Sequence, residues 1–237
     1  VKVLTGSTKS SDRKILLNDL KNGSINLLIG THAIFEQNVI FNNLGYAVID
    51  EQHRFVVKQR SKIWEKNNPP PHVLIMTATP IPRTLTMSLY GDLDLSIIDE
   101  LPPGRKDVIT VHRKDKNRLK VFGFIRDQIN QGRQVYIVYP LIEESKKMDL
   151  KYLEDGLESI TREFDKENYS IGVMHGRMRS SNKDIEMNNF LNGKIDILIS
   201  TTVIEVGVNV PNASVMIIEH AERFGLSQLH QLRGRVG

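Results

Sequence analysis

An internal repeat is the feature of this sequence that most constrains its fold. ILLNDLKNGSINLLIGTHAIF, which begins at Ile15, aligns without a gap with IEMNNFLNGKIDILISTTVIE, which begins at Ile185, an offset of 170 positions (185 − 15). The matches include asparagine, glycine and threonine as well as apolar residues: Asn18/Asn188, Asn22/Asn192, Gly23/Gly193, Ile25/Ile195, Leu28/Leu198, Ile29/Ile199, Thr31/Thr201 and Ile34/Ile204. Chance similarity between apolar strands does not explain matches of that kind. The repeat therefore predicts one helix–turn–strand–loop–strand unit that occurs twice, as two tandem lobes of an α/β fold.

The boundary between the lobes is predicted near residues 99–105, DELPPGR. Its Pro-Pro-Gly sequence continues neither a helix nor a central strand. We therefore divide the chain into lobes 1–104 and 105–237, joined by a linker that acts as a hinge.

Local patterns predict the elements of each lobe. Ser11 is expected to cap a helix that runs to about Lys21 and stops at Gly23, before a strand at 25–29. The apolar, β-branched run at 46–49 has the character of a strand buried on both faces. The other expected elements are strands at 1–4, 73–76, 134–140 and 171–174, helices at 82–89, 116–131, 150–164 and 180–191, and a solvated loop at 143–147.

Two adjacent carboxylates, Asp50 and Glu51, follow the strand at 46–49. Ligands of open α/β sheets bind at the carboxyl ends of the strands. Asp50 would hold Mg²⁺ through water, and Glu51 would orient or deprotonate an attacking water, a division of labour that suits phosphoryl transfer. The alternative is a strand that ends in a polar turn, since acid pairs after apolar runs are common.

A second stretch favours the catalytic interpretation. The strand at 73–76 runs into TATPIPRT at 77–84, which places hydroxyls and free backbone donors beside the acid pair. DEQH followed by TATPIPRT resembles motifs II and III of superfamily 2 helicases.

In the second lobe Glu219 and His220 stand where the first lobe has its acid pair, so we do not expect a second hydrolytic site there. QLRGRVG, which includes Gln231 and Arg235, resembles the start of helicase motif VI, whose arginine acts as a finger on a nucleotide held by the other lobe.

The ordered set of motifs resembles the RecG family of ATP-dependent DNA translocases over essentially the whole chain. The resemblance rests on these motifs: GTHA at 30–33, DEQHRF at 50–55, TATPIPRT, DELPPGR, HGRM at 175–178, the stretch 200–211 and the final QLHQLRGRVG. The resemblance implies two RecA-like lobes with parallel sheets flanked by helices, the first truncated at its N-terminus. It implies a cytoplasmic monomer that uses ATP and Mg²⁺ to remodel branched DNA, such as stalled forks and Holliday junctions, in repair and recombination.

The same resemblance implies the roles of individual residues. Asp50 and Glu51 correspond to the metal and water residues, and Gln52 and His53 to those that link the γ-phosphate to motif III, where Thr77 and Thr79 couple the sites. The residues that correspond to contacts with the DNA backbone are Thr31, His32, Thr201 and Thr202. Those that correspond to contacts with the nucleotide are Gly207, Asn209, Gln231 and Arg235. Asn209 stands where the family usually has aspartate, and Val56 where it usually has glycine, which puts the nucleotide contact and the loop after motif II in question.

Two alternatives stay open. The chain could belong to a related superfamily 2 translocase, such as the transcription-repair coupling factor, or to a nucleic-acid-binding module that does not hydrolyse ATP. The sequence holds no Walker A loop, so we expect an interior fragment of the motor that is inactive alone.

The net charge of +4 and pI near 9.2 are compatible with a polyanionic partner. The absence of cysteine excludes a disulfide framework, the seven histidines lack zinc-ligand spacing, and no run is long enough to span a membrane.

Overall fold

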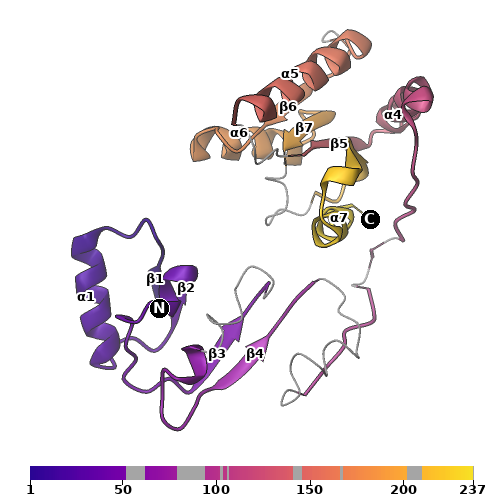
Figure 1. The fold of residues 1–237 in the computed structure, drawn as a ribbon. Helices are drawn as coiled ribbons and strands as arrows, with labels where there is room; N and C mark the ends of the chain where they lie inside the picture. Colours follow the sequence, from indigo (N-terminus) through magenta and orange to yellow (C-terminus); the bar gives the residue numbers. More distant parts are fainter. Residues whose placement is uncertain are drawn as a thin grey trace. The chain divides into compact units, whose positions relative to one another are not determined.

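The computed structural model describes residues 1–51, 62–78, 94–101, 104–105, 107–140, 146–165, 168–201 and 210–236, with side chains omitted at 146–152. The chain divides into two compact units, Val1–Leu85 and Thr86–Gly237 (Figure 1). The predicted helix at 82–89 lies outside the described residues. No helix among those residues is long and apolar enough to cross a membrane.

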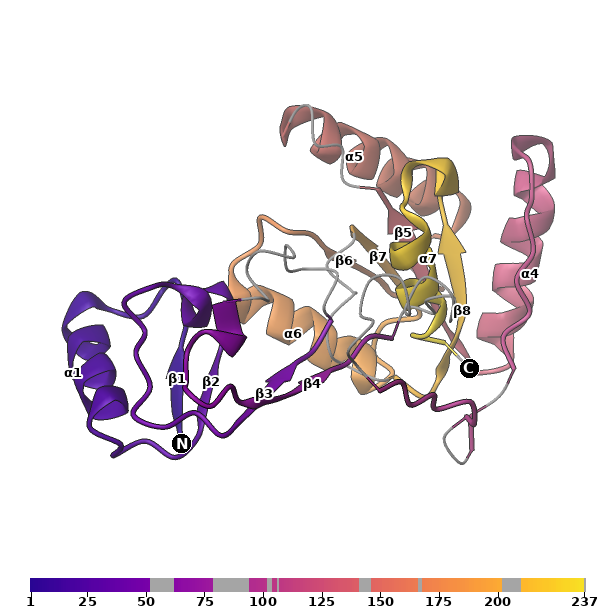
Figure 2. The ribbon, with the colours of Figure 1, turned by 60° about the horizontal axis from the view of Figure 1, so that its bottom comes forward.

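The second unit is built on a four-stranded parallel sheet in the order β6-β7-β5-β8 (Figure 2). Its strands are β5 (Gln134–Tyr139), β6 (Ile171–Met174), β7 (Ile197–Thr201) and β8 (Ala213–Ile218). Its helices are α4 (Arg118–Asn130), α5 (Lys146–Glu163), α6 (Ser180–Leu191) and α7 (Leu226–Arg233), with short 3-10 turns η3 (Asp115–Asn117) and η5 (Ala221–Arg223).

Helices cover both faces of this sheet, which confirms the predicted α/β class. Alternate side chains of β5 enter opposite cores, as the pleat requires. Tyr136 and Val138 pack with Phe190 of α6 and Leu232 of α7. The intervening residues pack in a separate cluster with side chains of α4 and α5, among them Phe122 and Ile160. Every residue of β5 is buried, as the continuous apolar run that follows Gln134 predicts.

The first unit contains two pairs of parallel strands. β1 (Lys2–Leu4) pairs with β2 (Leu28–Gly30), and β3 (Tyr46–Ile49) pairs with β4 (His72–Ile75). The helix α1 (Ser10–Lys21) packs Leu16 and Leu20 against Leu4. The 3-10 turn η1 (His32–Phe35) contributes Ala33 to that cluster and Phe35 to a second one with Ile49 and Ile63.

The internal repeat is confirmed where both of its copies lie in the described residues. Helices α1 and α6 are each 12 residues long and begin 170 positions apart. Gly23 (φ 77°) and Gly193 (φ 69°) follow them in left-handed conformations that glycine adopts without steric cost. The repeat also reaches further back than the sequence match, because Lys2 pairs with Leu28 in the same register as Gly172 with Leu198.

Several local predictions are wrong. β3 is not buried on both faces: Tyr46 is 58% and Val48 52% exposed, because among the described residues only one face of β3 packs on a core. Ser11 does not cap α1. The helix begins at Ser10, and the Ser11 hydroxyl donates to Asp12 instead, at 3.1 Å. The strand predicted at 25–29 forms at Leu28–Gly30, and α5 begins at Lys146, inside the predicted solvated loop.

Candidate nucleotide and nucleic-acid sites

The acid pair lies at the carboxyl edge of β3. Ile49, the last residue of the strand, is 4% exposed and packs against Phe35 and Ile63. Asp50 follows it on the surface and accepts a hydrogen bond at Oδ1 from the backbone N–H of Glu51, at 2.8 Å. Glu51 is half-buried, with φ of 50°. A buried apolar anchor therefore fixes two carboxylates at the end of the strand where ligands of such sheets bind.

The neighbouring strand brings Thr77 to the same edge. Ile49 pairs with Ile75 of β4, and the backbone N–H of Met76 donates to the carbonyl of Ile49 at 2.8 Å. The residues that follow the two strands are thus neighbours. The structure brings Asp50, Glu51 and Thr77 together, as the order of the two motifs predicts.

The chemistry of this edge fits a magnesium–nucleotide complex. Mg²⁺ prefers oxygen donors and keeps several waters, so it binds through one or two carboxylates plus phosphate oxygens. Asp50 and Glu51 are of that type. Within the described residues no group of three or more His, Cys, Asp or Glu side chains could form an all-protein metal cage. The donor set therefore fits an ion that completes its coordination with water and phosphate.

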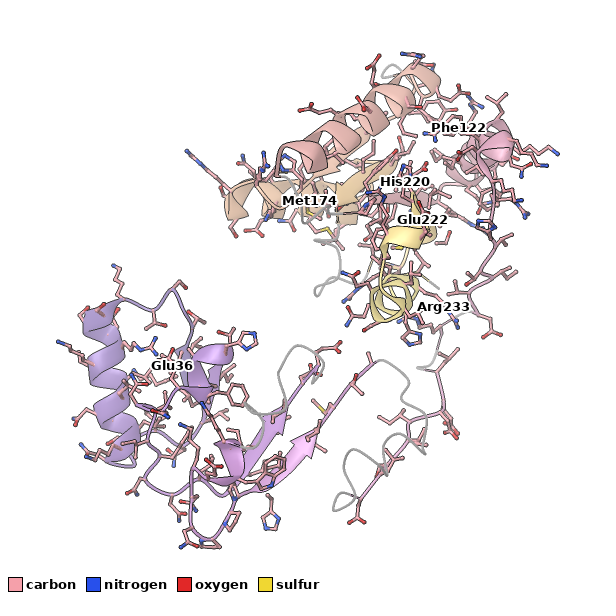
Figure 3. All side chains as sticks on the ribbon, viewed as in Figure 1. Glu36, Phe122, Met174, His220, Glu222 and Arg233 are labelled. Atoms are coloured by element: carbon pink, nitrogen blue, oxygen red, sulfur yellow. The ribbon has the colours of Figure 1, made fainter. Side chains whose placement is uncertain are left out.

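The second unit uses the equivalent position differently. Glu219 follows β8, and its side chain forms an ion pair with Arg118 at 3.6 Å. His220 has φ of 52°, and its Nδ1 lies 3.5 Å from Glu222 Oε1 (Figure 3). A hydrogen bond from its own backbone, followed by the neighbouring His220, lowers the pKa of Glu222 below its usual value. Because Glu219 forms this ion pair and is followed by a histidine, the edge does not present a second pair of adjacent acids.

Arg235 lies in a turn directly after α7. Its backbone N–H donates to the carbonyl of Leu232 at 2.9 Å, and its side chain is half-buried. Leu232 and Val236 on either side belong to the same core cluster as Tyr136. Burial raises the pKa of Tyr136 to about 12, and the positive charge of Arg235 acts in the opposite direction. Gln231, in the last turn of α7, is also half-buried.

The predicted contacts to a nucleic-acid backbone differ between the units. Thr31 and His32 are exposed after β2, and the N–H of Thr31 donates to the carbonyl of Leu4 at 3.3 Å. Thr201, the equivalent of Thr31, ends β7 and is only 2% exposed. Its buried hydroxyl makes no hydrogen bond within the described part of the chain. The other predicted site residues, Gln52, His53, Thr79, Thr202, Gly207 and Asn209, lie outside the described residues.

Sequence reasoning did not relate two exposed turns that the structure shows to be equivalent. Residues 5–9 join β1 to α1, and residues 175–179 join β6 to α6. Each turn is closed by the same bond: Thr8 N–H to the Thr5 carbonyl at 3.2 Å, and Met178 N–H to the His175 carbonyl at 3.1 Å. The offset of 170, continued back to Gly6 and Gly176, is the signal that would have identified them.

The second of these turns is strongly basic. Burial, then Lys183 and Arg177, lower the pKa of His175 below its usual value. Arg179 follows at the start of α6, where Lys9 precedes α1 in the first unit. Basic side chains beside the backbone donors of a helix N-terminus suit contacts to phosphates, which fix the position of a nucleic acid without reading its sequence.

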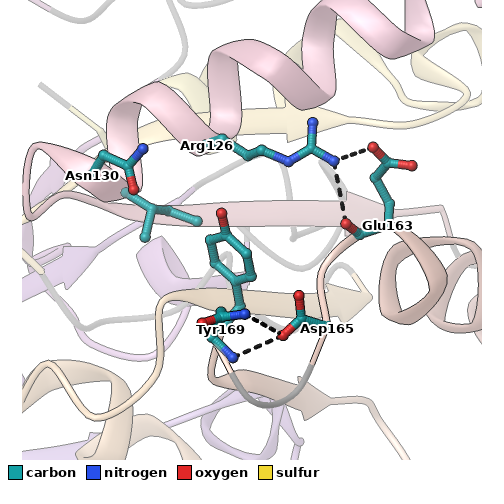
Figure 4. A pocket seen from close by; sticks show the side chains of 7 residues that line it. Arg126, Asn130, Glu163, Asp165 and Tyr169 are labelled. Carbon is teal, nitrogen blue, oxygen red and sulfur yellow. Dashed lines mark hydrogen bonds and ion pairs between the residues drawn. The ribbon is translucent and has the colours of Figure 1, made fainter.

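A polar hollow in the second unit lies at the opposite edge of the sheet (Figure 4). It sits between the end of α4 and the loop that leads into β6, and thus at the amino ends of the strands. Arg126 contacts Glu163 across it, and Asp165 accepts two hydrogen bonds from Asn168 at 2.9 Å. Because the predicted site residues follow the carboxyl ends of strands, this hollow is separate from the candidate site.

Two family models match the chain. The DEAD/DEAH box helicase model covers residues 1–88, and the helicase conserved C-terminal domain model covers residues 116–237. The chain belongs to the family of the helicase conserved C-terminal domain, whose model covers more than half of it. Over its full length it is 53% identical to the ATP-dependent DNA helicase RecG of Synechocystis and 49% identical to that of Thermotoga maritima, of which it spans 28% and 30%. The sequence resemblance to RecG is thereby confirmed.

Solved helicase structures share the fold. A RecG bound to a three-way DNA junction is 44% identical over 100% of this chain and 30% of that chain, with a TM-score of 0.63. The helicase MrfA bound to DNA and AMPPNP, at 18% identity, covers 99% of this chain and 35% of that chain with a TM-score of 0.64, which supports the fold alone. The two units are therefore helicase lobes of the RecA-like type.

Proposed function

We propose that this chain forms part of an ATP-dependent DNA motor that remodels branched DNA in repair and recombination. Its identity of about half over 237 residues to helicases named RecG is the observation that carries the proposal. The position of Asp50 and Glu51 at the carboxyl edge of β3 supplies the chemistry that such a motor needs. The expected form is a cytoplasmic monomer with lobes at 1–104 and 105–237.

The cofactors of the proposed reaction are ATP and Mg²⁺, the ion neutralising charge on the phosphates when bound. Asp50 would hold the ion, and Glu51 would orient the attacking water and accept its proton. Thr77 beside them, together with Thr79, would couple the nucleotide site to the rest of the lobe. Gln52 and His53 would contact the γ-phosphate. Arg235 would stabilise charge on the transferred group, and Gly207, Asn209 and Gln231 would complete the nucleotide contacts.

The proposed DNA contacts use backbone and hydroxyl donors, and those of the first unit are exposed. Thr31 and His32 lie beside the turn at 5–9, on one edge of the first unit. Thr201 and Thr202 would act with the basic turn at 175–179 in the second. Neutral donors of this kind bind phosphates of any sequence. Branched DNA is the expected substrate, because the RecG structure with 44% identity holds a three-way DNA junction.

The test is steady-state ATPase of the full-length protein with no DNA, linear duplex or a three-way junction. We expect the junction to stimulate hydrolysis most, and Glu51→Gln to reduce it by about 100-fold or more, as expected when a general base is lost. Glu219→Gln is the matched control at the equivalent position of the second lobe, and it should retain most of the activity. Equal stimulation by linear duplex would indicate a general translocase. No ATPase under any condition would leave a nucleic-acid-binding module.

A further inference from the structure

Arg105, at the end of the predicted linker and within the second unit, contacts the turn that carries Arg235. One of its terminal nitrogens, Nη2, donates to the backbone carbonyl of Gly234 and also approaches that of Val236, at 3.3 Å. These two carbonyls belong to the residues immediately before and after Arg235. A side chain 129 positions before Gly234 in the sequence therefore contacts both flanks of the candidate finger.

The local geometry suits an arginine at this position. Gly104 has φ of 84°, a conformation that allows the chain to turn just before Arg105. Val108, shortly after it, packs against the cluster that contains Leu232 and Val236. Gly234 caps the C-terminus of α7, where unsatisfied carbonyls and the helix dipole attract a cation. A guanidinium stays charged and offers several donors in one plane, so it can serve two carbonyls at once.

Resting on the ATPase function proposed above, we infer that Arg105 is a positioning residue for Arg235. By fixing the carbonyls of Gly234 and Val236, it sets the direction in which the Arg235 side chain leaves the turn. Finger catalysis depends on such placement, since a displacement of about 1 Å in a catalytic group can reduce turnover by about 100-fold. The same contact fastens the C-terminal end of the predicted linker, residues 99–105, to the rest of the second unit, so the predicted hinge motion must occur before residue 105.

The first test needs no nucleotide. Hydrogen exchange of the backbone amides of residues 234–236 should become faster in Arg105→Ala, because the turn loses its two bonds from the guanidinium. Arg126→Ala is the matched control, since Arg126 also donates to a backbone carbonyl of the same unit, that of Glu163, at 3.2 Å, but at the opposite edge of the sheet. Unchanged exchange in Arg105→Ala would overturn the inference even if the protein hydrolyses ATP.

The second test uses the ATPase of the full-length protein. Arg105→Ala should lower kcat by about 10- to 100-fold with little change in KM for ATP, and Arg105→Lys should recover only part of it, because an ammonium lacks the planar donors. Arg126→Ala should leave kcat unchanged.

A double variant separates positioning from general damage. In the background of Arg235→Ala, the change Arg105→Ala should have no further effect on kcat, since residues that act as a unit are not additive. An equal further loss in that background would show that Arg105 acts independently of Arg235 and would overturn the inference. Failure of the proposed function gives a different result, namely no ATPase in the wild type with hydrogen exchange still altered by Arg105→Ala.

Discussion

Glu51 and His220 occupy the same unusual backbone position in the two units. Each is the second residue after a strand, β3 or β8, and their φ angles are 50° and 52°. Within the described part of the chain they are the two non-glycine residues at positive φ. Left-handed backbone costs a non-glycine residue free energy, and such strain concentrates at functional sites. Both units keep the conformation, but only the first combines it with two acids in succession.

Replacing either residue by glycine should separate strain from chemistry. We expect His220→Gly and Glu51→Gly each to leave the free energy of unfolding unchanged or to raise it by up to about 1 kcal/mol, because glycine adopts positive φ readily. Only Glu51→Gly should abolish ATPase. Denaturant unfolding followed by circular dichroism, with ATPase on the same samples, checks both expectations. A clear loss of stability in both variants would show that side-chain contacts at these positions outweigh the strain.

Two helix glycines provide a second pair of opposite predictions. Gly123 lies inside α4, and a β-carbon added there meets no atom within 4 Å. Gly156 lies in α5, and a β-carbon added there would overlap the Tyr139 ring. Alanine favours helix over glycine by about 1 kcal/mol, so Gly123→Ala should stabilise the protein by up to that amount. Gly156→Ala should destabilise it by about 1–3 kcal/mol, because the buried tyrosine must move. Thermal unfolding of the two variants, side by side, measures the difference. Stabilisation by both would show that Tyr139 has room to adjust.

The sequence predicts those features that depend on local pattern. The repeat correctly predicts that α1 and α6 are equivalent, and the two glycines mark where both helices end. The same pattern places the acid pair and Thr77 at one edge, because neighbouring parallel strands carry their following residues to the same side.

Features that depend on distant contacts are not predictable in this way. Nothing in the sequence near β3 shows that Tyr46 and Val48 are exposed, because burial depends on which elements cover the strand. The bonds from Arg105 to the carbonyls of Gly234 and Val236 join residues that are far apart in the chain. Ser11 had the residue type of a cap, but the helix begins one position earlier.

Tyr136 should give the protein a measurable pH dependence at high pH. Its hydroxyl is buried and has no hydrogen-bond partner within the described residues, and burial raises its pKa to about 12. The unfolded chain releases this proton near pH 10, so between pH 10 and 12 the folded state binds more protons and its stability falls as pH rises.

Tyr136→Phe removes this contribution. We expect the variant to be as stable as the wild type or slightly more so at pH 7, because an unpaired buried hydroxyl is lost, and to lose less stability between pH 10 and 12. Tyr139, whose pKa burial and then Glu219 raise to about 12, keeps part of the dependence, and the double phenylalanine variant should remove more. Urea unfolding at a series of pH values is the measurement. Parallel curves for wild type and Tyr136→Phe would contradict the assignment.

Gln134 shows how the two units solve one structural problem with different residues. The carbonyl of Phe190, near the end of α6, accepts a hydrogen bond from Gln134 Nε2 at 2.6 Å, and the same nitrogen donates to Ile195 at 2.7 Å. The equivalent carbonyl in the first unit, that of Leu20, accepts from the backbone N–H of Asn42 at 3.3 Å. One donor is a side chain and the other is backbone, although the helices they serve are repeats.

This difference predicts unequal effects of substitution. Gln134→Met should lower the free energy of unfolding of the second unit by about 1–3 kcal/mol, since it leaves two buried carbonyls without that donor. Asn42→Ala should cost less, because the donating backbone N–H remains in place. Hydrogen exchange across α1 and α6 measures the two effects separately in one molecule. The Asn42 side chain lies against Gly23. If Asn42→Ala increases exchange in α1 as much as Gln134→Met increases exchange in α6, then the Asn42 side chain stabilises the end of α1 as strongly as Gln134 stabilises the end of α6.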